Sequence, residues 1–346
     1  TSPVPEAPTD TPRPDQFAGC IVGQCLGDAL GFPVEGHPPA ACARYVAEVL
    51  KAARTGQAGR GPFAFGQYTD DSQLARELLR SLVERGGWEP ADYARRVADL
   101  FRSDRIVGRG MACDQAARRL NAGVPWHQAG EPPPSAGNGT AMRAAPVGLF
   151  FAGEPQALLD TAAEQARITH QDPRCAAGSA AIAGAVALVL EGGAIEPGRF
   201  LGQLGQWAGR FSEEFAGYLA DLEGWLELPP EEAVAPIARA GVDPEFEREQ
   251  WPGISPFVVG SVLWSLYAFL RSPDDYWETV CTAIAVGGDV DTTAAMAGAV
   301  SGAHLGLEAL PGDLARRVND GGAWGYDDLV ALARRGFEMR RGEGGR

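Results

Sequence analysis

The chain has 346 residues, a hydrophobic content of 45% and a formal net charge of −15 at pH 7. This length suits one large domain or two small ones, and the apolar content is sufficient for a sizeable core. The negative charge argues against general nucleic-acid binding and against an anionic membrane surface as a partner. It does not exclude a small anionic ligand that is held by metal ions and backbone amides.

No stretch of the sequence approaches the ~18 apolar residues of a membrane span, and no signal peptide is visible. The six cysteines form neither a CxxC pair nor a dense framework, so we interpret them as buried, reduced thiols. Residues 1–15 are rich in proline and are predicted to form a disordered leader. Together these features predict a cytoplasmic protein that does not associate with membranes.

From Phe17 to about residue 339 the apolar residues recur at helical spacing, and no alternating strand pattern of any length appears. Further helices are predicted at about 40–53, 71–86, 91–103, 111–121, 155–169, 174–191, 198–208, 211–227, 230–240, from Pro256 to 270, 274–286 and 294–306. The sequence therefore predicts an all-α fold, a single compact domain of more than a dozen helices without a substantial sheet.

The first predicted helix carries a glycine at every fourth position, namely Gly19, Gly23, Gly27 and Gly31. A glycine ridge at this spacing lets a second helix approach closely. Each glycine costs ~1 kcal/mol in helix propensity, so close packing must offset that cost. The helix is predicted to end before Pro33, and Glu35 follows in the next loop.

Two carboxylates and two hydroxyls follow a glycine pair in the segment Gly287–Thr293. On an ideal helix Asp289 and Asp291 would point about 200° apart, so they converge only if the glycines hold this segment in a turn ahead of the helix. Converging carboxylates and hydroxyls suit a hard divalent cation. The simpler alternative is that one of the two aspartates caps the helix.

The segment Thr69–Ser72 repeats this composition of two hydroxyls and two carboxylates, and it also opens a predicted helix. Adjacent aspartates repel each other unless something neutralises them. Two such helix starts can meet around a pair of metal ions, because four carboxylates balance two divalent cations. The opposing helix macrodipole, at ~1 kcal/mol or less, is weaker than direct coordination.

Three loops add weaker signals. Val107–Gly110 is a glycine-flanked turn, and the glycines of Gly137–Arg143 can expose backbone N–H groups just before a helix, as in phosphate-binding loops. The simpler interpretation of the second loop is a turn with an N-cap, since it matches neither a Walker A loop nor a dinucleotide-binding fingerprint. His170 and Glu35 are, in the simplest interpretation, polar loop residues.

Taken in order, these segments resemble the ADP-ribosylglycohydrolase family, which includes the dinitrogenase reductase-activating glycohydrolases. The resemblance covers about residues 17–307. It rests on Gly27-Asp28-Ala29-Leu30-Gly31 with Glu35, Thr69-Asp70-Asp71-Ser72, Gly137-Asn138-Gly139 with Ala141-Met142-Arg143, Thr169-His170, and Gly287-Gly288-Asp289-Val290-Asp291-Thr292. It implies a compact orthogonal helical bundle over residues 16–340, with a binuclear magnesium or manganese site in a central cleft.

The resemblance also implies roles for individual residues. The metal ligands would be Thr69, Asp70, Asp71, Asp289, Asp291 and Thr292, with Asp291 bridging two Mg2+ ions, or Mn2+ as a possible substitute. The catalytic residues would be Glu35, Asp70 and Asp289. The substrate-binding residues would be Gly108, Arg109, Gly110, Ser135, Gly137, Asn138, Gly139, His170 and Ile254. Some relatives place an aromatic residue before the Gly-Asn-Gly turn to stack on adenine, whereas this chain has Ala136.

The implied activity is that of a metal-dependent hydrolase that removes ADP-ribose from modified protein side chains at C1″ of the distal ribose. Its partners would be ADP-ribose and ADP-ribosylated proteins, and the chain is expected to act as a monomer. An arginine linkage is favoured by analogy with the bacterial relatives. Serine-linked and small-molecule conjugates remain alternatives, as does a catalytically silent ADP-ribose-binding relative. An isoprenoid synthase fits less well, because Thr69–Gln73 lacks the third acidic residue of an Asp-rich motif.

Overall fold

The computed structural model describes residues 12–243 and 251–343. Over these ranges the chain forms sixteen α-helices joined by loops and short helical turns. The same ranges contain isolated β-bridges but no β-strand. The first eight helices are α1 (Pro14–Gly31), α2 (Pro39–Tyr45), α3 (Asp70–Arg85), α4 (Pro90–Arg102), α5 (Met111–Asn121), α6 (Ala145–Phe150), α7 (Pro155–Arg167) and α8 (Pro173–Val189). The rest are α9 (Pro197–Ala208), α10 (Glu213–Trp225), α11 (Pro230–Arg239), α12 (Val258–Arg271), α13 (Tyr276–Ala285), α14 (Val290–Leu305), α15 (Gly312–Ala315) and α16 (Tyr326–Glu343). The predicted all-α class is confirmed.

Several predicted boundaries differ from the observed ones. α1 begins at Pro14, inside the predicted leader, whose residues 1–11 lie outside the described ranges. The helix predicted at 40–53 is shorter, because α2 passes into a π-helical turn over Val46–Leu50. α14 begins at Val290 rather than at residue 294, so the second acidic segment lies partly within the helix.

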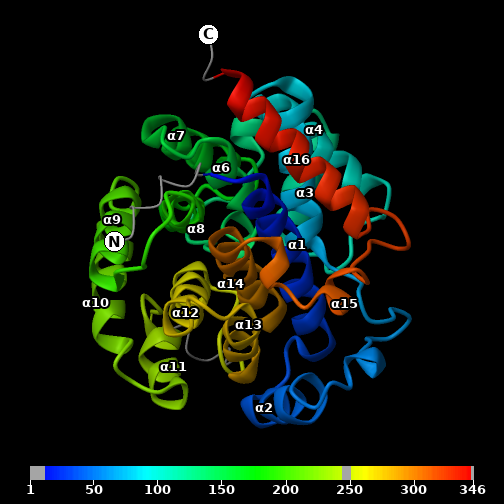
Figure 1. The fold of residues 1–346 in the computed structure, drawn as a ribbon. Helices are drawn as coiled ribbons and strands as arrows, with labels where there is room; N and C mark the ends of the chain where they lie inside the picture. The colour runs from blue at the N-terminus through cyan, green and yellow to red at the C-terminus, as the bar shows by residue number, and fades with distance from the viewer. Residues whose placement is uncertain (1–11, 244–250, 344–346) are drawn as a thin grey trace, which may run out of the picture.

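The centre of the bundle is the antiparallel pair of α1 and α14 (Figure 1). The predicted close approach along the glycine ridge is confirmed, because a Cβ atom added to any of the four glycines would lie 2.2–2.6 Å from a carbonyl oxygen of α14. The pairs are Gly19 with Gly302, Gly23 with Gly298, Gly27 with Ala294, and Gly31 with Val290. This register brings the end of α1, which carries Asp28, beside the start of α14, which carries Asp291.

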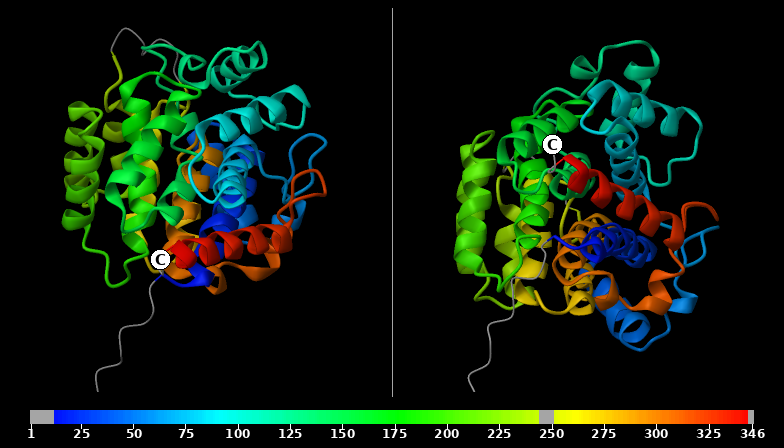
Figure 2. Two further views of the ribbon diagram at one scale, coloured as in Figure 1. Left: turned by 90° about the horizontal axis from the view of Figure 1, so that it is seen from above. Right: turned by 45° about the horizontal axis from the view of Figure 1, so that its top comes forward.

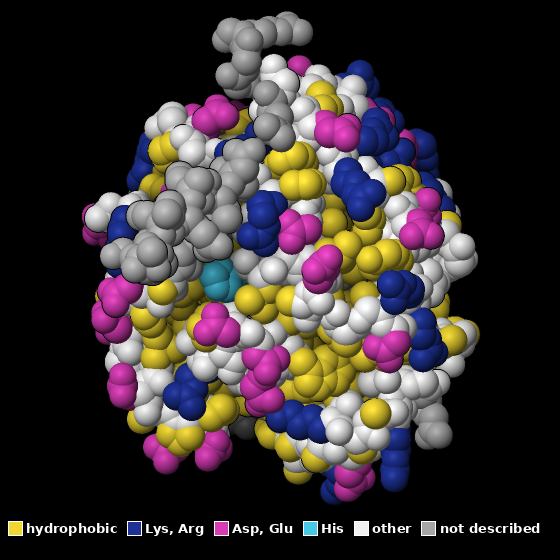
Figure 3. All heavy atoms as spheres, viewed as in Figure 1, with side chains coloured by type: hydrophobic (Ala, Val, Ile, Leu, Met, Phe, Trp, Pro, Cys, Tyr) yellow, Lys and Arg dark blue, Asp and Glu magenta, His cyan; other side chains and the backbone are white. Residues whose placement is uncertain are grey.

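The other helices surround this pair (Figure 2). α16 packs across α1 on one side, whereas α8 and α12 contact α14 on the other. α9 and α10 form an outer layer beyond α8. On the face that Figure 3 shows, acidic and basic side chains are interspersed among apolar ones.

One segment, Pro14–Val34, is long and apolar enough to cross a membrane, with a mean hydropathy of 1.4, contrary to the expectation from the sequence. Its apolar window is 94% buried inside the bundle, so the packing of α1 explains its composition. The six cysteines are all buried and none forms a disulfide, in agreement with the prediction of reduced thiols.

Candidate functional site

The N-terminus of α3 is held by a side chain from another helix. Thr69 occupies the N-cap position, but its side chain makes no capping hydrogen bond. Instead the buried carboxylate of Asp28 in α1 accepts hydrogen bonds from the backbone N–H of Thr69 (3.0 Å) and of Ser72 (3.2 Å). The hydroxyls of both residues also donate to Asp28, at 3.0 and 2.6 Å. Asp28 therefore fixes the first acidic segment against the central helix.

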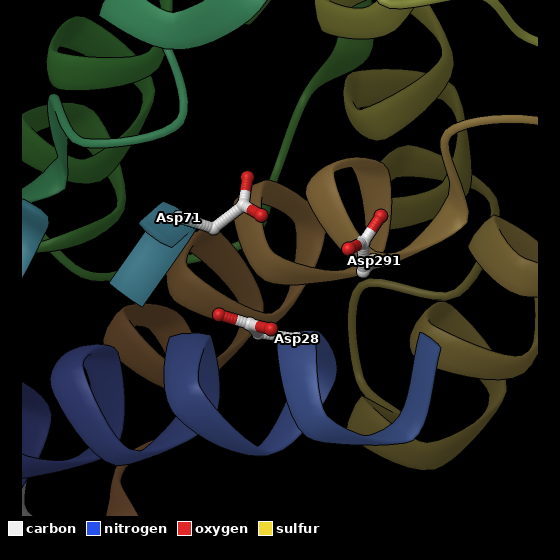
Figure 4. Close-up of side chains that lie close together, drawn as sticks. All are labelled: Asp28, Asp71 and Asp291. Carbon is white, nitrogen blue, oxygen red and sulfur yellow. The ribbon is translucent and has the colours of Figure 1, made fainter. Parts of the chain in front are cut away.

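Asp28, Asp71 and Asp291 converge from three different helices, α1, α3 and α14 (Figure 4). One carboxylate oxygen from each lies within 4.8 Å of the others. A second group of three, Glu35, Asp289 and Asp291, meets the same condition. Asp291 belongs to both groups, so the two acidic segments, which are over 200 residues apart in the sequence, share one centre.

Burial and mutual repulsion make this centre unfavourable for negative charge. Burial and the neighbouring carboxylates raise the pKa values of Asp70, Asp71 and Asp291 well above that of an ordinary aspartate. Burial likewise raises the pKa of Asp289 to about 6 and that of Asp28 to about 7. A positive charge placed among these groups would stabilise their ionised forms.

The second acidic segment is positioned by a glycine turn. Gly287 and Gly288 have φ values of +79° and +93°, a left-handed conformation that few other residues adopt. A Cβ atom on Gly288 would also lie 2.1 Å from the carbonyl oxygen of Ile254. Asp289 follows at the N-cap of α14, yet its carboxylate makes no capping hydrogen bond. The predicted turn is confirmed, and Asp289 remains available for another partner.

Ile254, which the sequence placed in the cleft, has a different position. It is fully buried and is not among the residues that line the cleft. Its carbonyl oxygen accepts a hydrogen bond from the backbone N–H of Asp289 at 2.8 Å. In the structure Ile254 therefore supports the backbone of Asp289.

Asn138 contacts the acidic centre directly. Its Nδ2 atom donates to Asp289 Oδ2 at 2.5 Å and to Ser261 Oγ at 2.9 Å, and its backbone N–H donates to the carbonyl of Pro256. Thr292 Oγ1 donates to the other oxygen of Asp289 at 3.1 Å. All the N–H groups of Asn138 are thus engaged. A diphosphate at this loop would therefore have to accept hydrogen bonds from other residues of the loop.

His170 packs against the Gly137–Gly139 loop and lines the cleft. A Cβ atom on Gly137 would lie 3.2 Å from His170 Nε2, so the loop needs its glycines to pack this closely. Burial and the charge of Arg143 lower the pKa of His170 to about 3, so the ring is neutral near pH 7. Arg143 donates to Thr169 Oγ1, which lies 2.9 Å from His170 Nδ1. This arrangement favours the tautomer with a hydrogen on Nε2, an N–H donor at the cleft wall.

Arg143 is a fully buried cation beneath the same loop. Its guanidinium donates to Gln165 and Thr169, and within the described ranges it forms no ion pair with a carboxylate. It also lies over the ring of Tyr93, 5.7 Å from the centroid. A buried positive charge without a counter-ion favours an anion in the adjoining cleft.

The loop Gly108–Gly110 lies against Asp70. A Cβ atom on Gly108 would lie 2.9 Å from Asp70 Oδ1, and the backbone N–H of Asp70 donates to the carbonyl of Val107 at 2.7 Å. The guanidinium of Arg109 is held by Asp104 and Asp114, so its charge is already neutralised. The backbone of this loop therefore contacts the acidic centre, whereas the Arg109 side chain pairs with other residues.

These groups surround a cleft of about 590 Å³. The predicted site residues that line it are Glu35, Asp70, Asp71, Gly108, Arg109, Gly110, Ser135, Gly137, Asn138, Gly139, His170, Asp289, Asp291 and Thr292. Thr69 is buried behind them, where its hydroxyl oxygen lies 3.0 Å from Asp28 Oδ1 and 2.8 Å from Asp71 Oδ2. The two large apolar side chains that are exposed in the described ranges, Met111 (77%) and Trp251 (40%), also line this cleft.

The acidic centre fits divalent cations. All its ligand atoms are oxygens, which magnesium, manganese and calcium prefer. Asp71 Oδ1 is buried and has no hydrogen-bond partner in the structure, although a buried charged oxygen normally has one. A cation beside Asp71 would satisfy this oxygen and offset the repulsion that raises the pKa values.

Sequence reasoning missed three residues of this site. Asp28 belongs to one of the motifs that carry the resemblance, but its neighbours in the sequence do not indicate a contact with α3. Arg60 binds Glu35 from a glycine-rich loop whose course the sequence does not predict. No sequence motif surrounds Trp251. Only the structure shows that its side chain is exposed and lines the cleft.

Comparison with known proteins identifies the family of this chain. The family model described as ADP-ribosylglycohydrolase matches residues 8–346. The ADP-ribosylhydrolase ARH3 of Mus musculus is 27% identical, covering 86% of this chain and 85% of the relative. The ADP-ribosyl-[dinitrogen reductase] glycohydrolase of Rhodospirillum rubrum is 28% identical, covering 86% and 88%. A solved structure titled "ADP-ribosylglycohydrolase-related protein complex" matches with a TM-score of 0.68 and 29% identity, covering 94% of this chain and 98% of that chain.

Proposed function

Because the chain belongs to the ADP-ribosylglycohydrolase family, we propose that it removes ADP-ribose from modified protein side chains with the help of two divalent cations. The observation that carries this proposal is the position of Asp291, which is shared by both groups of three carboxylates. A residue in that position can bridge two cations. The oxygen-only ligands favour magnesium or manganese over zinc.

The proposed ligands are those that the family resemblance implies, supported by the two groups of carboxylates that share Asp291. One cation would be held by Thr69, Asp70, Asp71 and Asp291, and the other by Asp289, Asp291 and Thr292 with Glu35 at the rim. Asp28 would orient the first set by fixing the start of α3. Bound cations would supply positive charge that orients the hydroxyls of the distal ribose and favours ionisation of the attacking water.

The chain's own carboxylates would handle the protons. Breaking the bond at C1″ builds oxocarbenium character on the ribose, and the departing group needs a proton while the incoming water loses one. Asp70 and Asp289 are buried beside the acidic centre, whereas the side chain of Glu35 is 29% exposed at the rim. This difference in exposure favours Glu35 for proton exchange with the departing side chain and with solvent.

The diphosphate would lie along the Gly137–Gly139 loop. His170 would offer its Nε2–H to a phosphate oxygen, and the buried charge of Arg143 would attract the anion from beneath the loop. Ser135 and the backbone of Gly108–Gly110 complete the proposed binding surface. Because Ala136 is small and buried, a different side chain must contact adenine.

An arginine linkage is the proposed specificity. This choice follows the analogy with the bacterial relatives alone, because the two proposed cations would neutralise the aspartates that line the cleft.

A release assay tests the proposed function. Peptides that carry ADP-ribose on arginine, on serine or on no side chain are incubated with the protein, with Mg2+ or Mn2+ and with EDTA. The proposal expects free ADP-ribose from the arginine-linked peptide, dependent on the cation. Equal release with EDTA would contradict the metal dependence, and preferential release from the serine-linked peptide would contradict the linkage.

A further inference from the structure

Arg60 lies in the irregular loop that precedes the first acidic segment, and its side chain contacts Glu35 at the rim of the cleft. Arg60 Nη1 lies 2.5 Å from Glu35 Oε2, the closest ion pair that Glu35 makes in the described ranges. A carboxylate oxygen of Glu35 also lies within 4.8 Å of oxygens from Asp289 and Asp291. Glu35 is therefore placed between one cationic and two anionic side chains.

This placement of Glu35 needs a counter-charge. One carboxylate oxygen from each of Glu35, Asp289 and Asp291 lies within 4.8 Å of the others, so the three negative charges repel one another. The loop alone does not fix the side chain: Gly36 and His37 are hydrogen-bonded to the backbone of Gly288, but the side chain of Glu35 is 29% exposed. A cation that pairs with Glu35 offsets the repulsion and holds the carboxylate near the other two.

The guanidinium of Arg60 is itself held in place. Nη1 also donates to the carbonyl of Phe32 at 3.0 Å, and Cζ lies 5.1 Å from the centroid of the Phe32 ring. Phe63 packs against the same ring at 5.8 Å, and its backbone is hydrogen-bonded to that of Arg60 in both directions. Arg60 is thus fixed by its backbone, by a carbonyl and by an aromatic face.

We propose that Arg60 is a positioning residue for Glu35, which it holds at the Asp289–Asp291 group so that this group binds its divalent cation tightly. The inference rests on the proposed function, because it takes Glu35 as part of a cation site. Partners that hydrogen-bond a metal-ligating carboxylate affect cation affinity by about 10- to 100-fold when they are removed. As an exposed ion pair, the contact contributes little to global stability.

The test measures Mn2+ binding directly by calorimetric titration of the metal-free protein. Arg60→Ala is expected to weaken binding at one of the sites by about tenfold, with an unchanged melting temperature. Arg60→Lys keeps the charge but not the planar fork, so its affinity is expected to lie between those of the wild type and Arg60→Ala. Arg54→Ala is the matched control, because Arg54 lies in the same loop, is exposed and forms no ion pair within the described residues.

A double-mutant cycle shows whether Arg60 acts through Glu35. In a Glu35→Gln background, Arg60→Ala is expected to cause no further loss of Mn2+ affinity. A tenfold loss that persists in that background, or Mn2+ affinity in Arg60→Ala equal to or above that of the wild type, would overturn the proposal. If Glu35→Gln alone leaves Mn2+ affinity unchanged, both this proposal and the ligand role of Glu35 in the proposed function are wrong. If Glu35→Gln lowers Mn2+ affinity but Arg60→Ala does not, this proposal alone is wrong.

Discussion

Asn138 donates a hydrogen bond to Asp289, with 2.5 Å between Nδ2 and Oδ2, and so links the glycine-rich loop to the acidic centre. The second hydrogen of the same amide goes to Ser261. A loop that resembles a phosphate cradle thereby also fixes the orientation of one proposed metal ligand.

Asn138→Ala is expected to reduce cation affinity and turnover by the equivalent of about 1–3 kcal/mol, the usual cost of removing a hydrogen bond to a charged group. The measurement is Mn2+ titration together with ADP-ribose titration of the metal-free protein. If the side chain serves Asp289, Mn2+ affinity falls and metal-free ADP-ribose affinity stays the same. If only ADP-ribose affinity falls, the side chain serves the diphosphate instead.

Gly23→Ala tests the close approach of α1 and α14. The added Cβ would lie 2.6 Å from the carbonyl oxygen of Gly298, so the helices must separate, at an expected cost of about 1–3 kcal/mol. Gly202→Ala in α9 is the control, since nothing lies within 4 Å of its added Cβ, and helix propensity there favours alanine by up to ~1 kcal/mol. Thermal unfolding should show a lower melting temperature for the first variant and an unchanged or higher one for the second. Equal melting temperatures would contradict the predicted packing.

The metal-free protein is expected to lose stability as the pH rises from about 4 to 8. The pKa of Asp28 is raised to about 7 and that of Asp289 to about 6, so the folded state binds more protons than the unfolded state over this interval. Stability contributed by the protonated carboxyls is present at low pH and is lost as the pH passes through these values. Chemical denaturation at several pH values with EDTA measures this slope.

Saturating Mg2+ or Mn2+ should flatten or reverse that slope, because a bound cation stabilises the ionised carboxylates and binds only the folded state. Asp291→Asn should also reduce the slope in EDTA, since it removes one of the mutually repelling groups. A metal-free protein whose stability rises between pH 5 and pH 8 would contradict the burial of these acids.

Trp251→Ala is expected to weaken ADP-ribose binding, because Trp251 is an exposed aromatic side chain that lines the cleft where Ala136 offers no ring. Stacking on a base contributes about 1–3 kcal/mol. Binding of ribose 5-phosphate, which has no base, should be unaffected and serves as the control ligand. An equal loss for both ligands would place Trp251 at the ribose or phosphate rather than at adenine.

The sequence predicts much of this structure, for reasons that the particular residues make clear. The glycine ridge and the Gly287–Gly288 turn are local patterns, because glycine permits close helix packing and positive φ angles wherever it occurs. Both predictions are confirmed. The start of α14 was predicted four residues late, because the acidic residues before Ala294 obscure the helix signal.

What the sequence could not predict depends on contacts between distant segments. Asp28 meets Thr69 and Ser72 only because α1 packs beside α3, and no spacing along the chain encodes that contact. Arg60 meets Glu35 because an irregular loop folds back over Phe32. Ile254 was expected at the cleft, but its backbone pairs with the Gly288 turn and buries its side chain.

Asp291 is proposed to contact both divalent cations of an ADP-ribosyl hydrolase, and the activity of the Asp291→Asn variant is the sharpest test of that role. The rate of ADP-ribose release from an arginine-linked peptide is measured for wild type and variant with saturating Mg2+ or Mn2+, alongside thermal unfolding of both. We expect turnover to be abolished while the variant stays folded, with unchanged or higher metal-free stability. Release at the wild-type rate, with a stability loss of about 0.5–2 kcal/mol as expected for a helix cap, would contradict it.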